Sequence, residues 1–166
     1  MQKPDDLRAW LTNAVPVLKR EPERLQVFID KGAIVATGAR GLAYEYRYTL
    51  TLQLLDYAGD PDGVMAPILV WVAINQPELL GNPERQANGI QFEADILDGD
   101  KVDLQVQIAL TERVKISPQG AGRFHTEHLA EPPFPDGEHP LPAAPGPDGF
   151  NRLYKDDELI AEWPSP

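Results

Sequence analysis

The clearest pattern in the chain is an alternation of apolar and polar side chains between Tyr44 and Leu54. Apolar residues occupy the even positions and polar residues the odd ones over about eleven residues, which is long for a strand. A period of two places the apolar side chains on one face, so one face is buried and the other meets water or a polar partner. The pattern predicts a long strand over residues 42–57.

Residues 90–96 and 102–110 also alternate, and the turn-forming segment 98–101 separates them. Gly99 in that segment suits a turn position with positive φ, so the two runs predict a hairpin with one buried face. The alternation of the second run continues to Ile116. Only Glu112 interrupts it, because a carboxylate stands there on the apolar side.

A shorter alternation predicts another strand over residues 25–30. We expect Gly32 to turn the chain and residues 33–37 to continue as a strand or a bulged edge. Residues 38–41 then form a loop tip.

Two helices are predicted from apolar spacing. In the first, Asp5 or Asp6 is the expected N-cap, Pro16 bends or ends the helix, and a short helical or extended piece leads on to Pro22. Its apolar residues are Leu7, Trp10, Leu11, Ala14 and Val15.

The second helix is the apolar segment 64–74, with Asp60 as the expected N-cap and Pro61 as the first helical residue. The interior Pro67 costs about 3 kcal/mol, which we expect packing to outweigh. The helix should stop before Pro77, and a polar connector with one helical turn should follow.

These elements predict an α+β fold: a mostly antiparallel sheet with two helices on one face, formed by residues 1–131. Seven of the sixteen residues from Pro132 to Pro147 are proline, so residues 132–149 are expected to form an extended linker. Residues 150–166 predict a C-terminal β-hairpin arm with its turn at Asp156-Asp157. An isolated hairpin is marginally stable, so it should dock on its own domain or on a neighbouring chain.

Composition narrows the function classes. The net charge is −11, which argues against a protein that reads nucleic-acid sequence, although DNA could slide past such a surface. The chain has no cysteine, which excludes disulfides and thiolate sites. No signal peptide is visible, and the apolar run 64–74 is far shorter than a membrane span needs. We expect a soluble intracellular protein without membrane contact.

The candidate chemistry is sparse. His125 and His128 lie near Glu127 and Glu131, and imidazole and carboxylate groups are zinc ligands. The spacing matches no metal-binding signature, and a strand would place the two histidines on opposite faces. No phosphate loop or nucleophile motif occurs. We therefore expect no catalytic, cofactor-binding or metal-binding residues; a small metal-dependent hydrolase using the two histidines is the alternative from another class.

The other candidate residues belong to surfaces. Tyr44 and Tyr46 are either core residues or an aromatic interface anchor at the end of the long strand. The remaining candidates for a contact with another subunit or a tube are charged residues near that strand and apolar residues of the hairpin: Arg40, Arg47, Leu153, Ile160 and Trp163.

Taken together, several short segments resemble the tail completion protein R family of contractile-tailed temperate phages, which also occurs in phage-derived bacteriocin particles. The segments follow one another in the expected order over almost the whole chain. They are Lys3 to Arg8, Tyr46 to Leu50, Asp56 with Gly59-Asp60, Pro67 with Trp71, Asn75 to Pro77, Leu110 to Arg113, Glu131 to Pro133, and Leu159 to Trp163.

The resemblance implies a structural virion protein without catalytic residues, similar in role to tail terminators. Such proteins are expected to form a hexameric ring that caps the tail tube and sheath, ends their growth and presents a surface for head joining. The implied partners are copies of the chain, the tube and sheath proteins and the head–tail connector, with DNA passing through unread. The implied location is the head-proximal end of the tail, after assembly in the host cytoplasm. A head–tail connector or a tail-assembly chaperone is the alternative within the same class of protein. The sequence does not distinguish a protein of a complete phage from one of a headless tailocin.

Overall fold

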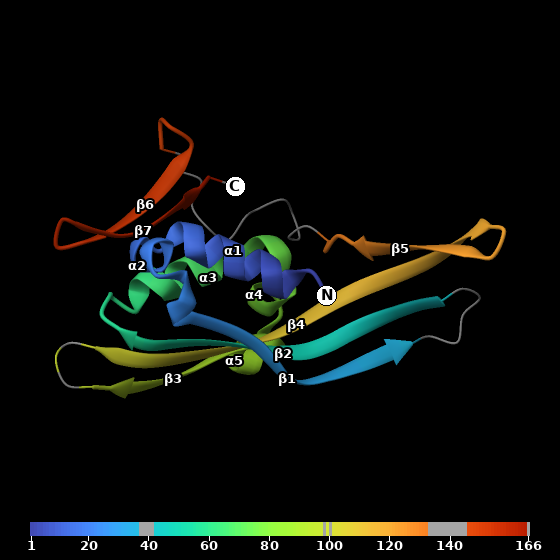
Figure 1. Cartoon of the computed structure of the whole chain (residues 1–166), viewed down its shortest axis with the longest axis horizontal. Coiled ribbons are helices and arrows are strands. Elements are labelled where there is room, and N and C mark those ends of the chain that lie inside the picture. Colours follow the sequence, from blue (N-terminus) through green and yellow to red (C-terminus); the bar gives the residue numbers. More distant parts are fainter. Residues whose placement is uncertain (37–41, 98, 100, 133–145, 166) are drawn as a thin grey trace.

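The computed structural model describes residues 1–36, 42–97, 99, 101–132 and 146–165. Three layers lie one above another: a long antiparallel sheet, a layer of helices on one face of it, and a small hairpin beyond the helices (Figure 1). This arrangement confirms the predicted α+β class.

The main sheet has the strand order β1-β2-β4-β3, and β5 pairs with the C-terminal half of β4. All these neighbours are antiparallel. The strands are β1 Leu25–Ala36, β2 Leu42–Tyr57, β3 Ile90–Ile96, β4 Val102–Gly120 and β5 Arg123–Leu129.

The alternation along β2 is confirmed at the centre of the sheet. Leu50, Leu52 and Leu54 are fully buried and pair with Ile108, Val106 and Leu104 of β4. A fully buried leucine contributes roughly 1.5–3 kcal/mol from apolar burial. These two strands therefore form the floor of the hydrophobic core.

The predictions for the two outer strands need correction. Gly32 does not turn the chain: β1 runs through it, and the irregularity is a bulge at Asp30, between Ile29 and Lys31. In the β3–β4 hairpin, the apolar face of β4 is buried, whereas Phe92 and Ile96 of β3 are 66% and 91% exposed. The helices do not extend over this edge, so alternation alone does not establish burial there.

The helices are α1 Lys3–Ala14, α2 Pro16–Arg20, the 3-10 turn η1 Pro22–Arg24, α3 Asp62–Asn75, α4 Glu78–Gly81 and α5 Pro83–Gly89. Helix α1 begins before both predicted caps, and no side chain caps it. Asp6 instead accepts a 2.9 Å hydrogen bond from the buried indole of Trp71, which links α1 to α3. Helix α1 ends at Ala14, before Pro16, which is the first residue of α2.

Helix α3 is the buried helix of the layer and begins one residue later than predicted. Asp60 still acts at its N-terminus, because its carboxylate accepts a 2.9 Å bond from the backbone N–H of Asp62. Pro67 lies inside the helix and is buried, and its carbonyl accepts a bond from the Trp10 indole. The connector that follows contains two short helices, α4 and α5, where one turn was predicted.

The C-terminal hairpin consists of β6 Phe150–Lys155 and β7 Glu158–Pro164. Asp156 and Asp157 have φ of +46° and +66°, as a tight two-residue turn requires. Within the described ranges, no helix is long and apolar enough to cross a membrane. Most of the predicted proline-rich linker, residues 133–145, lies outside the described residues.

Candidate functional site

The far half of the main sheet extends well beyond the helical layer (Figure 1). This part, here called the wing, comprises residues 31–36 of β1, 42–47 of β2, 111–120 of β4 and all of β5. Three of its apolar side chains are strongly exposed: Ile34 (64%), Leu42 (63%) and Phe124 (64%). They come from three strands and lie on the same face of the sheet as Tyr44 and Tyr46. A sheet face that leaves several apolar side chains exposed is a candidate interaction surface.

Tyr44 and Tyr46 lie in the wing, where they are half-buried. Their rings pack edge to face with centroids 5.1 Å apart, and their hydroxyl oxygens are 3.2 Å apart. Tyr48, on the same face but nearer the helices, is only 6% exposed. The three tyrosines therefore mark the transition from core to wing along one strand.

The opposite face of the wing carries charged groups. Arg47 pairs with Glu45 at 2.5 Å, and the Arg47 side chain is 56% exposed. Arg40 lies outside the described residues.

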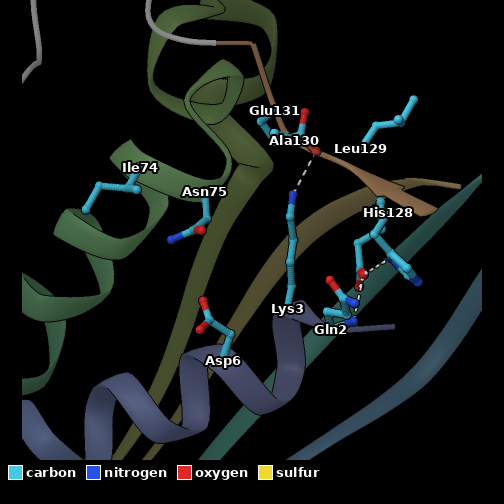
Figure 2. A pocket seen from close by; sticks show the side chains of 10 residues that line it. Gln2, Lys3, Asp6, Ile74, Asn75, His128, Leu129, Ala130 and Glu131 are labelled. Atoms are coloured by element: carbon cyan, nitrogen blue, oxygen red, sulfur yellow. Dashed lines mark hydrogen bonds and ion pairs between the residues drawn. The ribbon is translucent and has the colours of Figure 1, made fainter.

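A buried carboxylate stands where the wing meets the helices. Glu112 of β4 is 4% exposed. It accepts a bond of 2.5 Å from the Tyr48 hydroxyl and one of 2.7 Å from the backbone N–H of Gln2, and it lies 3.1 Å from Nδ1 of His128. Figure 2 shows Gln2 and His128, which both contact this carboxylate. One side chain thus connects β2, β4, β5 and the start of α1.

Lys3 makes a second set of connections beside Glu112. Its ammonium group donates to the Gln76 side chain at 2.6 Å, to the Thr111 carbonyl at 2.7 Å and to Glu131 at 2.8 Å. Burial lowers the pKa of Lys3, and the bond to Glu131 opposes that shift. Lys3 therefore links α1, the end of α3, β4 and the segment after β5.

These residues are here called the polar junction: Gln2, Lys3, Tyr48, Gln76, Glu112, His128 and Glu131. All of them except Tyr48 and Gln76 border a cavity of about 580 Å³. The cavity lies between the start of α1, the end of α3 and the end of β5 (Figure 2). The junction was not predicted from the sequence. The available signals were a glutamate on the apolar side of a strand and a lysine at the first turn of an otherwise amphipathic helix.

The junction is arranged to hold structure together. Burial raises the pKa of Tyr48, and the bond to Glu112 raises it further, so the phenol stays protonated as a donor. His125 is exposed and pairs opposite Ser117, three residues along β5 from His128, so the two histidines do not converge. Among the described residues, no three His, Asp or Glu side chains are placed to share a metal ion.

The hairpin docks on its own domain, against α3, α1 and α2. Ala161 of β7 is fully buried, and Lys155 forms an ion pair with Asp60 at the start of α3. Ile160 lies against Gly63 so closely that a Cβ there would be 2.7 Å from the Ile160 carbonyl oxygen. Of the candidate residues, Ile160 therefore makes an intramolecular contact, and Leu153 and Trp163 are half-buried.

Comparison with known proteins gives two matches. Residues 1–132 match the model of the family described as P2 phage tail completion protein R (GpR). The tail completion protein R of Escherichia phage P2 is 38% identical over 164 residues, which cover 98% of this chain and 99% of that protein. No solved structure matches.

Proposed function

The chain belongs to the P2 phage tail completion protein R family, and from this premise we propose that it closes the tail as a ring of identical copies. Family membership confirms the resemblance found in the sequence and supports a structural role in tail completion; the family is not one of enzymes. The proposed ring, a hexamer, caps the tail tube and sheath at the head-proximal end and ends their growth.

The observation that carries the proposal is the wing. It projects beyond the helical layer (Figure 1), and a single copy leaves Ile34, Leu42 and Phe124 exposed. The polar junction links the wing to the start of α1 through partly buried hydrogen bonds from Gln2 to Glu112 and from Lys3 to the Thr111 carbonyl. A rigid surface of this kind suits repeated contact with other subunits, because little conformational freedom is lost on binding.

The proposed partners are further copies of the chain, the tube and sheath proteins, and a head–tail connector that docks on the exposed side of the ring. The chain would be assembled in the host cytoplasm and stay in the virion. With a net charge of −11, the ring would not hold DNA phosphates as the genome passes.

The test is tail morphology in a phage or prophage whose gene for this chain is deleted. We expect tails of irregular, excessive length that carry no heads, and normal tails when the wild-type gene is supplied. Tails of normal length joined to heads in the deletion strain would contradict the proposal.

A matched pair of variants tests whether the wing carries the function. Ile34→Ser with Leu42→Ser removes two exposed wing side chains, whereas Leu69→Ser with Ile74→Ser removes two apolar side chains of α3 that are each 42% exposed. We expect the first variant to leave tails unfinished and the second to complete them. Equal completion by both would exclude the wing as the contact surface.

A further inference from the structure

The two outer strands of the main sheet each have a free edge. In the described part of the chain, β1 pairs only with β2, and β3 pairs only with β4. Natural proteins usually protect such edges, because unpaired backbone groups are ready to pair with another chain. Here both edges carry exposed apolar side chains as well as exposed charged ones.

The exposed apolar residues of the two edges lie on the same face of the sheet. Phe92 and Ile96 of β3 lie opposite Val106 and Val102 of β4, which are buried. On the other edge, Ile34 of β1 lies opposite Tyr46 and is 64% exposed. Both apolar rows therefore continue the core outward without cover.

The strand directions allow copies to join without reversal. Because every neighbour in β1-β2-β4-β3 is antiparallel, β1 and β3 run in opposite directions. A second copy placed alongside in the same orientation brings its β1 antiparallel to β3 of the first. Repetition of this contact is heterologous, and it closes into a ring if the rotation allows.

The charges on the opposite face favour this pairing over pairing of two β3 strands. Glu93 and Asp95 point to that face from β3. From β1, Lys31 points to it, and Asp30 at the bulge reaches it, where its carboxylate accepts a bond from Thr51; all four residues are exposed. Two β3 edges would bring four carboxylates together. Like charges opposite each other destabilise a strand pair, and opposite charges stabilise it.

We propose that β3 of one copy pairs antiparallel with β1 of the next, with Glu93 opposite Lys31. In that register Phe92 lies opposite Gly32 and Ile90 opposite Ile34. Gly32 has no side chain, so the bare backbone there leaves room for the phenyl ring. The inference rests on the proposed ring and specifies its subunit contact.

The chain has no cysteine, so engineered disulfides report the contact without background. Residues opposite each other in an antiparallel pair have Cβ atoms about 4.5–5.5 Å apart, near the range a disulfide bridges. The full-length double variant Lys31→Cys with Glu93→Cys is assembled into tails and oxidised. We expect a ladder of cross-linked copies on a non-reducing gel.

The control is Gln26→Cys with Glu93→Cys. Gln26 lies on the same strand and the same face as Lys31, but five residues away, and we expect no ladder from it. A ladder from the control alone would exclude the proposed register. Dimers from Glu93→Cys alone would show that two β3 edges meet, which would overturn the proposal.

Charge exchange separates this inference from the ring itself. We expect Glu93→Lys to impair tail completion and Lys31→Glu with Glu93→Lys to restore it. If the copies form a ring but show neither cross-links nor rescue by charge exchange, the proposed contact between β3 and β1 is wrong and the proposed ring is unaffected. Tails completed by a single copy would overturn both.

Discussion

Replacing Glu112 by glutamine tests whether the polar junction holds the wing to the helical layer. The substitution keeps the size of the side chain and removes the charge that accepts the bonds from Tyr48 and Gln2. Glu112 is 4% exposed and Tyr48 is 6% exposed, so water can replace few of the hydrogen bonds that the substitution removes.

The expected change in the free energy of unfolding follows from the type of hydrogen bond that is lost. A hydrogen bond to a charged group contributes about 1.5–3 kcal/mol net, so Glu112→Gln should lower the free energy of unfolding by that amount. Tyr48→Phe removes the other partner of the 2.5 Å bond and should cost a similar amount. Because both variants delete one interaction, the double variant should cost less than the sum, by roughly 1–2 kcal/mol.

The assay is urea unfolding followed by circular dichroism at one fixed protein concentration, since association shifts apparent stability. Glu45→Gln is the control, because Glu45 lies on the neighbouring strand in an ion pair with the exposed Arg47. It should change stability by less than about 1 kcal/mol. Additive effects of Glu112→Gln and Tyr48→Phe would refute a direct bond between the two side chains.

Three other predictions concern the hairpin, alkaline stability and the histidines. Gly63→Val should detach the hairpin, because a Cβ there would meet the Ile160 carbonyl at 2.7 Å; proteolysis should then release the C-terminal segment faster than in the control Ile74→Ala. Burial raises the pKa of Tyr57 from 10.0 to about 12, so the folded state keeps a proton that the unfolded state loses. Stability should therefore fall as pH rises from 10 to 12, by up to about 1.4 kcal/mol per pH unit from this group, and Tyr57→Phe should have a shallower slope in urea unfolding. His125→Ala, at an exposed position, should leave tail completion unchanged in a complementation assay. If the variant failed to complete tails, a catalytic role for His125 would have to be considered again.

Much of the fold could be predicted because the spacing of apolar residues and the turn-forming residues between the segments indicated the same elements. The strand over residues 42–57, the hairpin around Gly99 and the buried helix that contains Trp71 all occur in the structure. The errors arose where tertiary contacts decide. Asp6 pairs with a buried indole instead of capping its helix, and Phe92 and Ile96 of β3 are left exposed, whereas Ile90 at the start of the strand packs against the core.

The candidate site was less predictable. Alternation identifies which side of a strand is apolar, but it does not say how far the covering layer extends, so the wing followed only from the structure. The junction joins residues far apart in the chain: Lys3 with Glu131, and Tyr48 with Glu112. A single sequence gives no sign of such pairs beyond the misplaced charge at Glu112.

The central claim is that this chain works by association with copies of itself at the end of a tail. The direct measurement is the number of copies at the head-proximal end of one completed tail, obtained by electron cryomicroscopy of purified tails. We expect a closed ring, with six copies if it matches a hexameric tube. A single copy at that end would contradict it.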